Sequence, residues 1–225
     1  MYAPRMNVAD WLRTLNAIQI VLRDSHRTEQ IHVVEETTSK RRLAVALDEI
    51  RASPEGRALL SRRPELNKEQ VDYAALRRLP ADSLGGAYIR HLDDNGLSAD
   101  SQATATRFVE DPDIAYLVRR FRQTHDVWHP LTGLGTQPYE EVVIHAFSYG
   151  QLELPVSALI VSLGGIKHGV LERRWDMLTH TMSDAYRKGR AAAPLLGVVW
   201  EDQWAEPLAA VRRRYRVDPV ASPPS

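Results

Sequence analysis

The sequence contains no cysteine among its 225 residues. This absence excludes disulfide cross-links, thiolate nucleophiles and thiolate-ligated metals, so any metal site must use imidazole and carboxylate ligands. The sequence also lacks an excess of charge, because 29 lysine and arginine residues balance 29 aspartate and glutamate residues. A neutral chain has no global basic field that would attract nucleic acid, and we therefore expect no nucleic-acid partner.

Long apolar runs are absent as well. The longest apolar stretch, 152–170, is interrupted by Glu153, Pro155, Lys167 and His168, whereas a membrane-spanning helix needs about 20 apolar residues. We predict a buried helix that can touch lipid without crossing a bilayer. The N-terminal segment lacks the apolar core and cleavage site of a signal peptide. We expect a cytoplasmic protein that can associate peripherally with the inner face of the cell membrane.

Helical spacing recurs along the chain, and alternating β patterns are scarce, which indicates an all-α fold. Two apolar stripes with steps of three and four residues are Trp11, Leu15, Ile18, Leu22 and Leu43, Ala46, Leu47, Ile50. Further helices are expected over 84–92, 111–129, 138–150, 171–188 and 200–215. We predict a single helical bundle-like domain over 1–217, followed by a disordered tail, 218–225, that is rich in proline and serine.

The predicted helix that begins at Asp111 carries the residues of greatest chemical interest. His125 and His129 are four residues apart, about 6 Å along the axis, so both imidazoles can reach one ion. Asp126, rotated by about 100° from His125, can act as a ligand or orient an imidazole. The proline and glycine residues of 130–138 reverse the chain and can return Glu141 toward this helix.

Nitrogen and oxygen ligands of this kind suit zinc, iron or manganese, and we predict a metal site between two successive helices. Two other interpretations of 125–129 remain open besides a hydrogen-bonded core. One is the HExxH zinc-protease helix, with a shorter aspartate in place of the general base. The other is the HD dyad of helical phosphohydrolases, with His91 and Asp176 as further ligands, although it leaves His129 and Glu141 without a role.

The motif HDVWH, followed by eleven residues and Glu141, resembles the HDxxH-x11-E signature of the coenzyme Q biosynthesis protein 4 family. The segments 79–92, 107–126 and 189–215 also resemble blocks of that family, in the same order. The similarity extends over roughly residues 28 to 217. His145 differs from the pattern, because it stands where the family is expected to have lysine, and could join or tune the site.

The resemblance implies an all-α fold and a divalent metal held by His125, Asp126, His129 and Glu141, the residues also expected to carry the catalysis. Zinc is the metal it favours, with iron, manganese or magnesium as alternatives. It further implies an apolar cavity for an isoprenoid tail. The implied activity is that of a 4-hydroxy-3-methoxy-5-polyprenylbenzoate decarboxylase-like lyase, which replaces the ring carboxylate by a hydroxyl in ubiquinone biosynthesis.

Two alternatives to this activity are a non-catalytic scaffold that binds a prenyl lipid and an HD-type isoprenyl phosphohydrolase. The partners implied by the resemblance are a prenylated hydroxybenzoate or another isoprenoid lipid, other enzymes of quinone biosynthesis and the membrane surface. A homodimer is compatible with the sequence.

Overall fold

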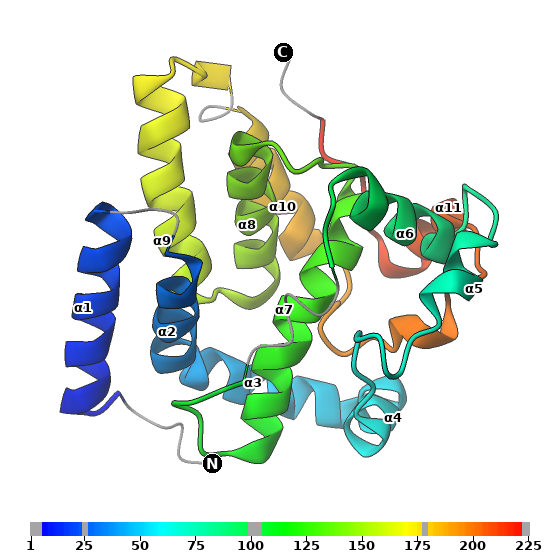
Figure 1. The fold of residues 1–225 in the computed structure, drawn as a ribbon, viewed down its shortest axis with the longest axis horizontal. Coiled ribbons are helices and arrows are strands. Elements are labelled where there is room, and N and C mark those ends of the chain that lie inside the picture. Colours follow the sequence, from blue (N-terminus) through cyan, green and yellow to red (C-terminus); the bar gives the residue numbers. More distant parts are fainter. Residues whose placement is uncertain (1–5, 24–26, 99–104, 177–179, 222–225) are drawn as a thin grey trace.

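Helices that cross one another make up the computed structural model, which describes residues 6–23, 27–98, 105–176 and 180–221 (Figure 1). No strand occurs within these ranges, and Ser83 and Pro207 form an isolated bridge. The all-α single domain predicted from helical spacing is therefore confirmed.

Eleven α-helices, one π-helical segment and one 3₁₀ turn are described. Their bounds are α1 (Val8–Arg23), α2 (Thr28–Thr38), α3 (Lys40–Ala52), α4 (Pro54–Arg62), α5 (Tyr73–Arg77), α6 (Leu84–Asp94), α7 (Pro112–Thr132), α8 (Pro138–Leu152), α9 (Pro155–Gly164), the π-helical turn η2 (Gly165–Leu171), α10 (Met182–Ala191), the 3₁₀ turn η4 (Trp200–Asp202) and α11 (Leu208–Tyr215).

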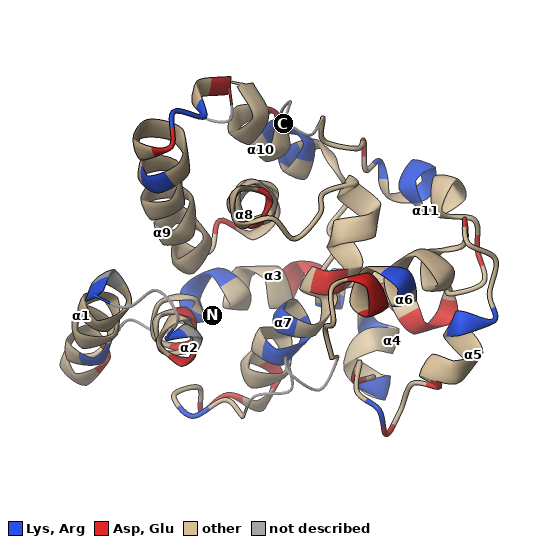
Figure 2. Cartoon of the chain, turned by 45° about the horizontal axis from the view of Figure 1, so that its top comes forward, with Lys and Arg blue, Asp and Glu red and all other residues tan. Residues whose placement is uncertain are grey.

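Helix α7 lies at the centre, in contact with α3, α6 and α8 (Figure 1). Its start follows the predicted capping signals: the Asp111 side chain accepts hydrogen bonds from the backbone N–H groups of Asp113 and Ile114, and Pro112 occupies the first turn. Sixteen of its 21 residues are buried, so α7 contacts other elements on nearly every side. Basic and acidic residues are interspersed over most of the helices (Figure 2), in keeping with the neutral net charge.

The sequence led us to predict that α7 ends before Pro130, but the helix continues past this proline. The helix continues to Thr132 and ends at Gly133, which takes the left-handed conformation with φ 76°. The Arg212 side chain donates hydrogen bonds to the carbonyl oxygens of Pro130 and Leu131. These bonds satisfy terminal carbonyls and stabilise the last turn in spite of the proline.

The apolar stripe of α1 is exposed at Trp11 and Leu15, whereas Ile18 is partly buried against the core. Trp11 and Leu15 are 55% and 59% exposed, whereas Asp10 and Thr14 are buried. The buried face contains apolar Ala17 and also polar groups that pair with polar groups elsewhere: Thr14 Oγ1 lies 2.7 Å from Thr37 Oγ1. The side chain of Leu22 lies outside the described residues. The second stripe, from Leu43 to Ile50, is buried as predicted.

The segment 152–170 is not one buried helix: it contains the last residue of α8, the whole of α9 and most of η2. Val156 and Ser157 are buried, but Ile166 and Val170 are exposed. No helix within the described ranges has the combination of length and apolar character that a bilayer crossing requires.

The C-terminal third also departs from the predicted helices. The helix expected over 171–188 is interrupted near Arg173, which has φ 60°, and the one expected over 200–215 is divided because Pro207 precedes α11. The tail expected to be disordered over 218–225 begins in contact with the core. Val220 is buried and donates its N–H to the Thr132 carbonyl, whereas 222–225 lie outside the described residues.

Helices α8 and α10 approach so closely that glycine is required where they cross. A Cβ atom added at Gly189 would lie 2.2 Å from the Phe147 carbonyl oxygen, and one added at Gly150 would lie 2.4 Å from the Tyr186 carbonyl oxygen. Because both obstacles are backbone atoms, a larger side chain would push the helices apart.

We predict that Gly189→Ala lowers the free energy of unfolding by about 1–3 kcal/mol, the range measured for overpacked sites. Urea unfolding followed by circular dichroism would measure the change. The control is Ala191→Ser, an exposed position near the end of the same helix, which should stay within about 0.5 kcal/mol of the parent protein. Equal stability of Gly189→Ala and the control would contradict the close crossing.

Candidate metal centre

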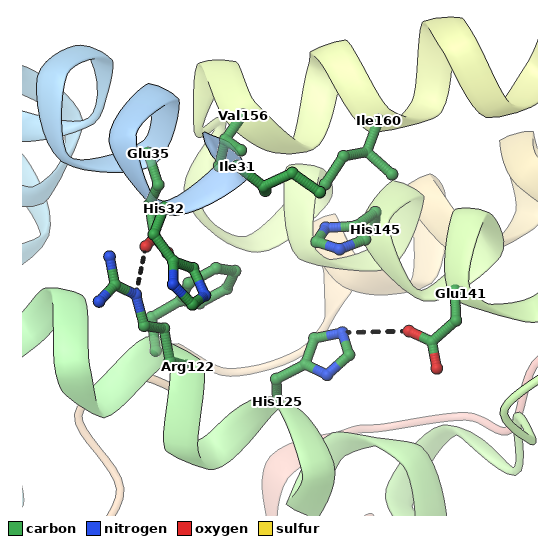
Figure 3. A pocket seen from close by; sticks show the side chains of 10 residues that line it. Ile31, His32, Glu35, Arg122, His125, Glu141, His145, Val156 and Ile160 are labelled. Carbon is green, nitrogen blue, oxygen red and sulfur yellow. Dashed lines mark hydrogen bonds and ion pairs between the residues drawn. The ribbon is translucent and has the colours of Figure 1, made fainter. Parts of the chain in front are cut away.

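The reversal between α7 and α8 brings the predicted site residues together. Gly133 ends α7, and the side chain of Glu140 accepts a hydrogen bond from the Gln137 N–H at the start of α8. Glu141 consequently lies in the first turn of α8 and points toward α7 (Figure 3).

Glu141 lies between the two histidines of the motif. Its carboxylate oxygens lie 3.5 Å from His129 Nε2 and 3.9 Å from His125 Nε2. One ligand atom from each of the three residues can be chosen so that all lie within 4.8 Å of one another. The spacing of the motif therefore produces, in the folded chain, a cluster of two nitrogens and one carboxylate.

Asp126 belongs to a second, adjoining group. Its carboxylate is buried, and one oxygen lies 3.5 Å from His125 Nδ1. Ligand atoms of Asp126, His129 and His91 also lie within 4.8 Å of one another. All four residues expected from the motif are thus present at one locality, distributed over two groups that share His129.

The donor atoms of the cluster fit a divalent cation. His125 Nε2 is buried and has no hydrogen-bond partner among the described residues. Such a nitrogen lowers the stability of the fold unless another group binds to it. His129 Nδ1 lies 3.2 Å from the Leu134 carbonyl. A histidine that donates one N–H to a carbonyl has its other nitrogen free for a metal, the usual arrangement around ligated ions.

The site perturbs the proton affinities of its members. Burial lowers the pKa of His129 well below its usual value, and the charges of His125 and His91 lower it further. Burial raises the pKa of Glu141. Burial alone would lower the pKa of His125, but the hydrogen bond to Asp126 and the charge of Glu141 outweigh it, and the pKa is raised. His125 is therefore the histidine of the motif that binds a proton most readily.

His145 lies beside the cluster on α8, with its ring centroid 5.3 Å from that of His125. Burial lowers the pKa of His145 to about 3, so it is neutral at physiological pH. Its Nδ1 lies 3.4 Å from Ser157 Oγ on α9. His145 is not a member of either metal-binding group.

A cavity of about 420 Å³ adjoins the cluster. His125, Glu141 and His145 form one polar end of its lining, and Ile31, Val156 and Ile160 from α2 and α9 form an apolar wall (Figure 3). The family resemblance implied an apolar cavity for an isoprenoid tail, and this cavity has one apolar wall.

The other end of the cavity was missed by sequence reasoning. Glu35 is buried there and accepts a hydrogen bond from Arg122 Nε at 2.5 Å, while Arg122 also contacts Glu36 at 2.9 Å. Burial raises the pKa of Glu35 to about 7, although Arg122 opposes the shift. Burial lowers the pKa of neighbouring His32 to about 4. One signal in the sequence could have indicated this end of the cavity: charged residues occur within the otherwise apolar run that begins at Ile31.

One of the ligands that the phosphohydrolase interpretation requires does not lie at the site. His91 does lie beside the motif, but Asp176 is exposed and is not a member of either metal-binding group. His129 and Glu141, which that interpretation leaves without a role, are both members of the cluster.

Comparison with known proteins shows the family of this chain. The model of the family "Coenzyme Q (ubiquinone) biosynthesis protein Coq4" matches residues 3–221. The mitochondrial ubiquinone biosynthesis protein COQ4 homologue of Bos taurus is 35% identical over 86% of this chain and 72% of its own length, and the human homologue is 33% identical over 94% and 79%. A crystal structure of a Nostoc punctiforme protein assigned to ubiquinone biosynthesis superposes with a TM-score of 0.70 and 25% identity, covering 92% of this chain and 97% of that one. The chain therefore belongs to the Coq4 family of ubiquinone biosynthesis proteins.

Proposed function

We propose that this protein is a metal-dependent enzyme that oxidatively decarboxylates a polyprenylated hydroxybenzoate during ubiquinone biosynthesis. The observation that carries the proposal is the cluster of His125, His129 and Glu141, which lies at the polar end of a cavity with an apolar wall. Asp126 adds a buried carboxylate at the same place. A substrate with an acidic ring and a long apolar tail matches such a cavity at both ends.

His125, Asp126, His129 and Glu141 would hold the ion, with zinc the first candidate and iron, manganese or magnesium as alternatives. When bound, a divalent cation would supply positive charge that holds the ring carboxylate or phenolate and stabilises negative charge as carbon dioxide leaves. Neutral His145 can form a hydrogen bond with the ring without adding charge. The Glu35 carboxyl, with a pKa of about 7, can accept or release a proton at the other end of the cavity.

The reaction requires an oxidant. Exchange of the carboxylate for a hydroxyl is a two-electron oxidation, and we take dioxygen as the electron acceptor. One oxygen atom enters the hydroxyl, and the other leaves as water when a reductant supplies two electrons and two protons. The apolar wall limits the water around the ring and binds the tail at about 25 cal/mol per Å² of buried apolar surface.

Association with a membrane surface is part of the proposal, because the substrate dissolves in lipid. Trp11, Leu12 and Leu15 on α1 are more than half exposed, as are Ile166 and Leu171 at η2. Helices α1 and α9 lie on the same side of the molecule (Figures 1 and 2), and α2 and α9 contribute the apolar wall of the cavity. A bilayer on this side would cover the exposed side chains and place the cavity near its substrate.

The affinity for the metal should depend on pH through His125. Because the pKa of His125 is raised, a proton competes with the ion more strongly there than at His129, whose pKa is lowered. We predict that affinity for Zn²⁺ rises about tenfold per pH unit below the pKa of His125 and levels off above it. Competition with a chromophoric chelator between pH 6 and 8 would measure this. His145→Phe should retain the slope, and a constant affinity would contradict it.

Purified protein loaded with Zn²⁺ or Fe²⁺ should release carbon dioxide from a prenylated hydroxybenzoate in the presence of dioxygen and ascorbate. We expect His129→Ala to lose both bound metal and turnover, by at least about 1000-fold, since a metal supplies several kcal/mol to such a reaction. His168→Ala, a change at η2, is the matched control and should turn over normally. Tight binding of the substrate without turnover by the parent protein would instead support a scaffold for other enzymes of the pathway.

The triple variant Trp11→Ser, Leu12→Ser, Leu15→Ser should bind anionic phosphatidylglycerol vesicles at least about tenfold more weakly, because each exposed side chain would otherwise bury apolar surface in the bilayer. Co-sedimentation would measure the affinity. Leu97→Ser, an exposed leucine just after α6, should bind as the parent protein does. Equal sedimentation of all three proteins would refute the membrane face.

A further inference from the structure

His91 approaches the metal cluster from a third helix. It lies on α6, and its ring centroid is 4.5 Å from that of His129. One ring nitrogen of His91 can be chosen within 4.8 Å of ligand atoms of both Asp126 and His129. The motif that names the other four residues does not include His91.

The hydrogen-bonding state of His91 points to a ligand that binds it. Its Nε2 is buried and has no hydrogen-bond partner among the described residues, as is true of His125 Nε2. A buried nitrogen without a hydrogen-bond partner destabilises the folded state. A cation that accepts lone pairs from both histidines would remove this destabilisation at two places at once.

The ring spacing is compatible with a shared ion. Two imidazoles bound at about 2.1 Å and separated by 90–109° at the metal have centroids about 4.6–5.3 Å apart. The corresponding spacings are 4.5 Å between His91 and His129 and 4.9 Å between His125 and His129. The planes of His91 and His129 are inclined by 21°, so the two rings lie nearly parallel.

We propose that His91 is a fifth protein ligand of the metal centre, which then draws its ligands from α6, α7 and α8. This inference rests on the metal site in the proposed function and refines it. A third imidazole gives a ligand set rich in nitrogen, which favours borderline divalent ions such as Zn²⁺, Co²⁺ and Fe²⁺ over Mg²⁺. The site would therefore select a transition metal even where Mg²⁺ is abundant.

The test is titration of the full metal-free chain with Co²⁺, whose absorption bands report coordination. His91→Phe keeps a flat ring against His129 but removes the nitrogens. We expect its affinity for Co²⁺ to fall by more than about 100-fold, beyond the 10–100-fold effect of losing a group that only orients a ligand. Its preference for Co²⁺ over Mg²⁺ should fall as well, and its absorption bands should shift.

His145→Phe is the matched control, since His145 is also buried and close to His125 but is not a member of either group. Its affinity and bands should match those of the parent protein. X-ray absorption of the Zn²⁺-loaded parent protein, which depends on no variant, should count three histidines. Two histidines, or parental affinity and bands in His91→Phe, would overturn the role of His91.

The two proposals can fail separately. If the parent protein binds neither Co²⁺ nor Zn²⁺, the proposed metal-dependent function fails, and the role of His91 fails with it. If the parent binds tightly, His129→Ala does not, and His91→Phe binds as the parent does, the inference about His91 alone is refuted.

Discussion

The burial of α7 is the constraint on which the rest of this structure depends. A helix enclosed on nearly every side can carry a charged side chain only where another element supplies the opposite charge. Arg120 is fully buried and contacts Glu201 at 2.6 Å, and Arg122 contacts Glu35 and Glu36. The partners come from distant parts of the chain, so these pairs fix how α2 and the C-terminal region pack against the central helix.

In the second half of α7 the buried groups need a positive partner rather than a negative one. There the side chains of His125, Asp126 and His129 meet Glu141, a set of lone pairs and negative charges. A bound cation would balance this end of the helix as Glu201 balances Arg120. On this view the metal contributes to the stability of the central helix as well as to the chemistry that we propose.

The position of the cluster also suits a substrate that has both an acidic ring and a lipid-soluble tail. The cavity lies between α7 and the outer helices α2 and α9, so that one end is polar and one wall is apolar. Helix α1 contacts α2 partly through polar groups and leaves Trp11 and Leu15 of its apolar stripe exposed. The same arrangement thus offers a site for an acidic ring and an outer face suited to the phase in which a prenylated substrate dissolves.

The sequence by itself determined the helical class, the start of α7 and the motif residues, because capping, periodicity and four-residue spacing are local properties of a chain. It also determined that Glu141 could return to α7, since proline and glycine enforce a reversal. Tertiary structure decided which face of α1 is buried and that α7 continues past Pro130, because both depend on partners distant in sequence, Thr37 and Arg212. It alone brought Glu35 to the site, and it placed His91, which the sequence had offered only within the phosphohydrolase interpretation, beside Asp126 and His129. No local pattern specifies which side chain of another helix will meet a buried cluster.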